Sequence, residues 1–254
     1  MSNIHIPKFN EIISKSVELY KGSFKVLFYV AIIASVVREF LQVLINKMGM
    51  NKILIIAEKG GISAVQNQID SSIITSIFIY ACISGLIWVF VNAICMIILN
   101  NQWRRRANDS KVIIRIILSS AFTLIISSIL AKVLISFGLM FYIIPGLVLG
   151  TLFFVYMPAI LFDGKGILVC LQYSFQLAKC NFGSTLIMCI LTIFLTIFPD
   201  LIGLLIRAQA GMSNMEFGMD EVIISFVSAL IIPFVSALIL TQYYALRTRA
   251  ESEE

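Results

Sequence analysis

Three ionisable side chains interrupt apolar stretches of this sequence and are its clearest candidates for chemistry. Arg38 and Glu39 are neighbours late in the first apolar run, and Asp200 follows Pro199 late in the fifth. A helical rise of about 1.5 Å per residue places all three in the outer half of those runs. We expect each side chain to extend separately to the outer membrane surface. The alternative is that they form a polar cluster that binds a ligand, with Asp200 accepting from Arg38.

Residues with the spacing of known catalytic or metal sites are scarce. Ser128 and Lys132 lie one helical turn apart, as in a serine–lysine dyad, but Lys132 falls at the predicted membrane surface, where a lysine extending to water explains it. His5 is the single histidine, and the five cysteines show no C-x-x-C pair and no metal-ligand spacing. We therefore expect no enzyme activity, and no catalytic, cofactor-binding or metal-binding residues.

The composition indicates a membrane protein. Of 254 residues, 59% are hydrophobic and 13% are charged, whereas soluble domains average roughly 45–50% and about 25%. The mean hydropathy is +0.97, and a soluble chain of this size could not bury so much apolar surface. The net charge of +5 does not indicate nucleic-acid binding, because Lys and Arg accumulate in the cytoplasmic loops of membrane proteins.

Six apolar runs predict one integral membrane domain over residues 1–254. They approach the roughly 20 residues that a transmembrane helix needs, and they do not alternate as barrel strands do. With the N-terminus inside, 13 of the 19 Lys and Arg residues fall on the cytoplasmic side, so both termini are expected there. Trp103, Tyr243 and Tyr244 are expected in an aromatic belt at that surface. The predicted spans are 24–45, 73–99, 112–136, 138–162, 183–206 and 222–246.

Two amphipathic segments, about 7–22 and about 164–180, precede spans on the cytoplasmic side. Their apolar residues recur at helical spacing opposite a polar stripe, which predicts helices in the headgroup region or packed beneath the bundle. The two segments also align without gaps, which predicts an internal repeat of two units in the same orientation. The alternative is that so short a likeness arose by chance. The matching patterns are Ser16-x-Glu18-Leu19-x-Lys21-x-x-Phe24 and Ser174-x-Gln176-Leu177-x-Lys179-x-x-Phe182.

The fourth predicted span contains two prolines, Pro145 and Pro158. Each removes a backbone donor, which predicts a broken or strongly curved helix. The sequence from Asp163 to Gly166, Asp-Gly-Lys-Gly, has the composition of a tight turn. We expect these residues and the following segment, with Ser174, to form a structural hinge at the inner face.

This stretch resembles a known family. Pro145-Gly146, Pro158, Asp163-x-x-Gly166 and Ser174-x-x-Leu177, at these spacings, resemble the YciC family of bacterial inner-membrane proteins. The pattern is more distantly similar to the membrane domain attached to some glycerophosphodiester phosphodiesterases. The close likeness covers about 140–185. It implies a multi-pass inner-membrane protein of unestablished molecular function, and it supplies no catalytic residues to carry over.

We therefore expect an all-α, polytopic helical bundle in the bacterial inner membrane, with six transmembrane helices and two interfacial ones. The expected role is non-enzymatic and related to the envelope or to lipids. The alternative is a small-molecule or lipid carrier, which would need a polar-lined cavity at the bundle centre. The expected partners are the lipid bilayer and a lipid or membrane protein, with no nucleic acid and no cofactor.

Single cysteines in a cysteine-free background test this topology. An impermeant maleimide should label positions 63 and 213 from outside and the other four only after permeabilisation, because only those two lie in predicted outer loops. Outside labelling of position 174 would overturn the interfacial helix, the repeat and the family resemblance together. The six sites are Ser14, Ser63, Asp109, Ser174, Ser213 and Ser252.

Overall fold

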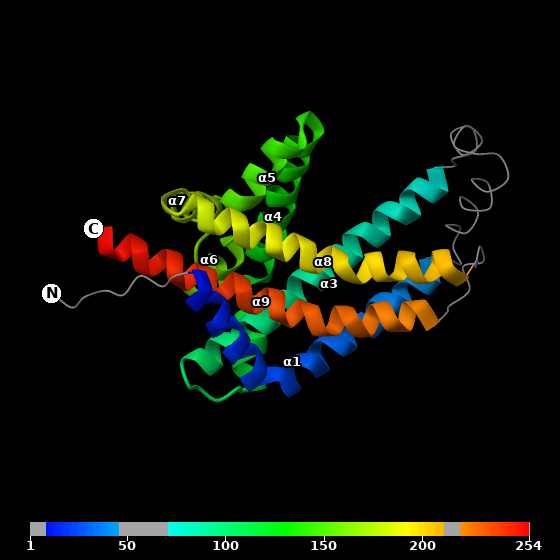
Figure 1. Cartoon of the computed structure of the whole chain (residues 1–254), viewed down its shortest axis with the longest axis horizontal. Helices are drawn as coiled ribbons and strands as arrows, with labels where there is room; N and C mark the ends of the chain where they lie inside the picture. The colour runs from blue at the N-terminus through cyan, green and yellow to red at the C-terminus, as the bar shows by residue number, and fades with distance from the viewer. Residues whose placement is uncertain (1–8, 46–70, 211–218, 254) are drawn as a thin grey trace.

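The computed structural model describes residues 9–45, 71–210 and 219–253 (Figure 1). Every secondary-structure element in these ranges is an α-helix, and six helical segments are long and apolar enough to cross a membrane. The chain is therefore an all-α, multi-pass membrane protein, as its composition predicts. The helices are α1 (Phe9–Ile45), α3 (Ser71–Trp103), α4 (Ser110–Phe141), α5 (Ile143–Leu152), α6 (Tyr156–Asp163), α7 (Ile167–Cys180), α8 (Phe182–Ala210) and α9 (Met219–Glu253).

Helix α9 lies at the centre of the bundle. It packs against α1, α8, α3 and α7, with α1 and α8 beside it along much of its length (Figure 1). Leu238, Leu240, Gln242 and Tyr243 are fully buried. Because these residues point in different directions around the helix, neighbours must cover this part of α9 on every side.

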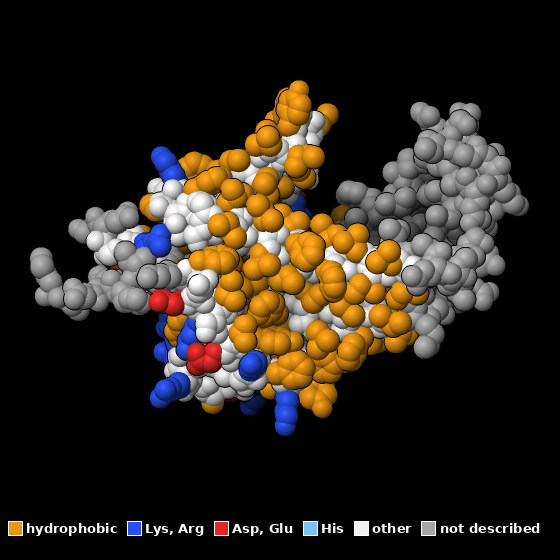
Figure 2. Space-filling view, viewed as in Figure 1, with side chains coloured by type: hydrophobic (Ala, Val, Ile, Leu, Met, Phe, Trp, Pro, Cys, Tyr) orange, Lys and Arg blue, Asp and Glu red, His pale blue; other side chains and the backbone are white. Residues whose placement is uncertain are grey.

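Charged and apolar side chains occupy different parts of the surface. Figure 2 shows Lys and Arg gathered toward the end where α9 finishes, whereas hydrophobic side chains cover much of the rest of this face. Large apolar residues such as Tyr29, Ile33, Phe194 and Ile197 are exposed on α1 and α8. So large an exposed apolar surface is rare on a soluble monomer, and here it suits contact with lipid tails.

The predicted interfacial helix 7–22 is not a separate element. Helix α1 runs from Phe9 to Ile45 without interruption, although Figure 1 shows it changing direction part-way along. Gly22 permits a close contact with α3, since a Cβ there would lie 1.8 Å from Nε2 of Gln102. Ser23 donates a hydrogen bond to the same glutamine side chain. We predicted two segments because an amphipathic stretch gives way to an apolar run near residue 23. Such a change in composition does not by itself end a helix.

The turn between the third and fourth spans lies later than predicted. Helix α4 continues to Phe141 rather than ending near 136, and Tyr142 alone separates it from α5. Helices α4 and α5 pack closely beside this turn, because a Cβ on Gly146 would lie 2.9 Å from the backbone nitrogen of Leu139. The glycine thus allows the two helices to approach each other where a larger residue would clash.

The fourth span is broken, as the two prolines predict, but the break lies between them. Helix α5 ends at Leu152 and α6 begins at Tyr156. Pro145 and Pro158 are each the third residue of their helix. The N–H groups in the first turn of a helix have no intrahelical acceptor. A proline, which has no N–H, therefore fits there without the loss of a hydrogen bond.

Helix α7 confirms the predicted helical segment 164–180. Cys170, Leu171, Ser174, Leu177 and Ala178 are buried along one side. The predicted polar stripe remains at the surface, with Gln172, Gln176 and Lys179 all exposed. The helix therefore packs against the bundle through its small and apolar side chains.

The two aligned segments also have matching environments. Ser16 and Ser174 are both 0% exposed, and Leu19 and Leu177 are both 3% exposed. The polar or charged residues of the shared pattern are exposed in both segments: Glu18, Lys21, Gln176 and Lys179. The segments differ in how they join their spans, because α1 continues without a break whereas α7 ends at Cys180 before α8 begins. The internal repeat therefore stays a prediction.

Most of the two predicted outer loops lies outside the described residues. Of loop 46–72, only positions 71 and 72 are described, as the start of α3; of loop 207–221, positions 211–218 fall outside. The side chain of Glu39, a candidate for the polar cluster, also lies outside the described part of the chain.

The two cysteines of α7 should differ in reactivity. Burial raises the pKa of the Cys170 thiol, an effect that its hydrogen bond with Ser127 only partly offsets, whereas Cys180 is exposed. Because the thiolate is the nucleophile, we expect maleimide to modify Cys180 at least about tenfold faster than Cys170 near neutral pH. Mass spectrometry of inverted membrane vesicles measures both rates. Equal rates would contradict this packing of α7.

Since position 174 is fully buried, the native Cys180 is a better topology probe than a cysteine placed there.

Candidate functional site

The predicted turn after the fourth span forms as expected. Helix α6 ends at Asp163, and Gly164 adopts a left-handed conformation with φ 61°. Its N–H donates to the carbonyl of Ile160 at 3.2 Å, and Gly166 caps the start of α7. A glycine meets this positive φ without the strain that a side chain would add.

Ser174 supports the break in the fourth span. Its hydroxyl donates to the carbonyl of Leu152 at 2.9 Å and accepts from the N–H of Val155 at 3.2 Å. These backbone groups flank the gap between α5 and α6. One serine on α7 therefore satisfies a donor and an acceptor that the broken helix would otherwise leave without a protein partner.

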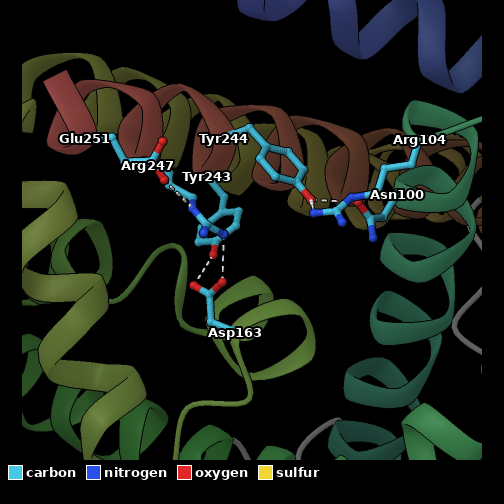
Figure 3. Close-up of polar contacts among 7 residues, drawn as sticks. All are labelled: Asn100, Arg104, Asp163, Tyr243, Tyr244, Arg247 and Glu251. Carbon is cyan, nitrogen blue, oxygen red and sulfur yellow. Dashed lines mark hydrogen bonds and ion pairs between the residues drawn. The ribbon is translucent and has the colours of Figure 1, made fainter.

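Asp163 links this hinge to α9 (Figure 3). Its carboxylate accepts hydrogen bonds from the hydroxyl of Tyr243 and, at 2.7 Å, from Nη1 of Arg247. Arg247 also donates to Glu251 through Nε at 2.9 Å. The Asp163 side chain is 12% exposed, so its charge is largely removed from water and is compensated by these partners. We call these four residues the inner-end cluster.

A neighbouring contact holds the end of α3 to α9. The hydroxyl of Tyr244 donates to Asn100 Oδ1 at 2.7 Å, and Arg104 donates to the same hydroxyl at 3.4 Å (Figure 3). The Tyr244 and Trp103 ring centroids are 5.1 Å apart. The ends of α3 and α9 and the turn from α6 to α7 therefore meet at one end of the bundle. We call it the inner end, because the charge distribution predicts that it faces the cytoplasm.

The sequence missed the role of Tyr243 and Arg247. We expected Tyr243 in an aromatic belt at the membrane surface, but the structure buries it completely. The available signal was the four-residue spacing of Tyr243, Arg247 and Glu251, which puts them on one face of α9. That spacing cannot show that the face turns toward Asp163, because the pairing depends on where α6 ends.

The structure brings together two candidates for the outer-half polar cluster. Arg38 from α1 and Asp200 from α8 line one cavity of about 90 Å³, with Ser228 from α9. Asn92 from α3 is also in its wall, and its Oδ1 accepts from Ser236 at 2.8 Å. We call this the polar cavity. The hydrogen bond from Ser236 to Asn92 joins α9 to α3, with the asparagine oxygen as acceptor.

A larger apolar cavity adjoins it. This space of about 590 Å³ is bounded by α5, the break after it, α8 and α9. Trp88, Thr196 and Val235 line both cavities. The break that Ser174 supports therefore forms part of the apolar cavity's wall, through Phe153 and Phe154.

The possible serine–lysine dyad is not assembled. The Ser128 hydroxyl accepts from Tyr156 at 3.0 Å, and Nζ of Lys132 lies 5.7 Å from the Trp88 ring centroid. These contacts give each residue a structural role. In the described ranges, no three His, Cys, Asp or Glu side chains lie together so as to hold a metal ion.

Comparison with protein-family models, curated proteins and solved structures gives no match. The resemblance to the YciC family therefore rests on the sequence motif from Pro145 to Leu177. Within that motif, the structure gives Asp163 and Ser174 clear positions in the hinge.

The contact between Asp163 and Tyr243 should contribute measurably to stability. Tyr243→Phe removes one donor from a largely buried carboxylate, which should cost about 1–2 kcal/mol and lower the unfolding temperature in detergent by roughly 2–4 °C per kcal/mol. Glu251→Gln is the matched control, because its exposed pair with Arg247 contributes at most about 0.5 kcal/mol. Equal shifts for the two variants would show that Asp163 does not hold the hinge to α9.

Proposed function

We propose that this protein is a non-enzymatic inner-membrane protein of the YciC type that binds a membrane lipid within its helical bundle. The bias of Lys and Arg toward one side supports placing both termini in the cytoplasm. Arg104 at the end of α3 and Asp163 in the hinge both contact the last turns of α9, which puts these basic segments at one end of the bundle, as that orientation requires. The resemblance around residues 140–185 supports the family and the bacterial inner membrane.

The apolar cavity is the observation that carries this proposal. Its volume of about 590 Å³ falls within the roughly 300–1,000 Å³ of small-molecule sites. Its lining is almost entirely apolar, so water would find few hydrogen-bond partners in it. In a membrane, the abundant molecule that suits such a space is a lipid, with an acyl chain as the buried part.

A non-enzymatic role agrees with the contacts of the nucleophilic side chains. Ser128 is held by Tyr156 and Ser174 by the broken backbone. Cys170 is buried and donates to Ser127 at 3.3 Å. Each of these groups has a structural task, and the basic residues at the inner end suit the membrane surface rather than nucleic acid.

A lipid carrier is the second candidate, and the break beside the apolar cavity favours it. Carriers often use interrupted helices next to their binding sites. A carrier should move fluorescent lipid between the leaflets of proteoliposomes at a rate above that of protein-free vesicles. Lipid binding without such movement favours a binding protein.

Filling the apolar cavity should displace its lipid. Gly150 lies in the wall, and a Cβ there would meet only Cys189 Sγ, at 3.8 Å. Gly150→Phe should reduce copurifying lipid severalfold, because the ring occupies the space of the acyl chain, whereas Gly150→Ala should retain it. Native mass spectrometry in mild detergent measures the bound fraction, and thermal unfolding confirms that both variants fold. Absence of lipid from the parent protein, or equal loss in both variants, contradicts the proposal.

A further inference from the structure

The two cavities follow each other along α8. Helix α8 begins at the inner end, and Cys189 in the apolar cavity lies seven residues along it, or about 10 Å. Thr196, shared by both cavities, is about 21 Å along, and Asp200 in the polar cavity about 27 Å. Along α8, the apolar space therefore lies nearer the inner end and the polar space farther from it. This is the arrangement of tail and headgroup in an outer-leaflet lipid.

The polar cavity contains groups of both charges. Arg38 contributes a guanidinium and Asp200 a carboxylate, and they come from helices far apart in the sequence. Ser228 is 6% exposed and forms no hydrogen bond to another residue in the described ranges. The Thr196 hydroxyl donates to the carbonyl of Thr192 at 2.7 Å, so it is left to act as an acceptor. The cavity therefore offers a cation, an anion and hydroxyl groups.

We propose that the joined cavities bind an aminophospholipid of the outer leaflet. Its phosphodiester lies at Arg38, its primary ammonium lies at Asp200 and Ser228, and one acyl chain fills the apolar cavity. Guanidinium binds phosphate through charge-assisted hydrogen bonds, and carboxylate binds ammonium in the same way. This inference rests on the proposed lipid-binding function and names the headgroup that the same site selects.

The charges of the polar cavity favour this headgroup over two other classes. An anionic lipid with an uncharged polar headgroup brings a phosphate to Arg38 but no cation to the Asp200 carboxylate. A quaternary ammonium has no N–H to donate to Asp200 or Ser228. A primary ammonium is small and has three donors, which suits the acceptors present.

A competition among lipids tests the headgroup. The purified full-length protein is exchanged into mixed micelles with equal amounts of phosphatidylethanolamine, phosphatidylglycerol and phosphatidylcholine of identical acyl chains. Native mass spectrometry should show phosphatidylethanolamine enriched at least about tenfold, the factor that corresponds to one charge-assisted hydrogen bond. Soluble phosphoethanolamine, which lacks acyl chains, should not displace the lipid. Displacement by it would overturn the role given to the apolar cavity.

Asp200→Asn should remove this preference while leaving the total amount of bound lipid unchanged, because the acyl-chain site is intact. Asp109→Asn is the matched control, since Asp109 caps α4 at the inner end and should preserve the enrichment. Ser228→Ala gives a second measure that changes no charge, and it should lower the enrichment by a smaller factor. It also keeps the test decisive if Asp200→Asn does not fold.

The two proposals fail in different ways. A parent protein without bound lipid overturns the lipid-binding function itself. Bound lipid with equal amounts of the three headgroups, or with an enrichment that neither the Asp200 nor the Ser228 variant changes, overturns only the assignment of an aminophospholipid.

Discussion

Backbone groups that a transmembrane helix leaves unpaired must find protein partners, because the bilayer core has no water to supply them. This constraint governs the fourth span, where α5 stops at Leu152 and α6 starts at Tyr156. The Ser174 hydroxyl meets it by contacting Leu152 and Val155 together. Ser174 lies on α7, so the break depends on α7 packing at this place. The turn at Gly164 connects α6 to α7, and the contact of Asp163 with Arg247 holds the end of α6 to α9.

Two groups of polar residues in the bundle have different consequences. The inner-end cluster is saturated, since Asp163, Tyr243 and Arg247 satisfy one another and connect the hinge to α9. The polar cavity at the other end contains Arg38, Asp200 and Ser228 around a space. A saturated cluster rigidifies the structure around it, whereas a lined space can accept a ligand. The apolar cavity lies between the two and shares part of its wall with the hinge.

Much of the architecture could be predicted, and the errors have physical causes. Long apolar runs identify spans reliably because hydrocarbon tolerates few charges, and two prolines in one span predicted a broken helix. The position of the break was missed, because Pro145 and Pro158 fit the first turns of their helices and Ser174, distant in sequence, supports the gap. The turn at Tyr142 was also missed, because it depends on Gly146 packing against Leu139.

The sequence alone determined the class of protein, its six apolar helices and the residues that interrupt them, because these depend on composition and local spacing. It also indicated that Arg38 and Asp200 lie at similar depth, since helical rise is fixed. Only the tertiary structure placed those two side chains on one cavity, turned Tyr243 and Arg247 toward Asp163 and opened an apolar space beside α5. Such contacts depend on how each helix is rotated and tilted against its neighbours, which packing decides and one-dimensional hydropathy does not record.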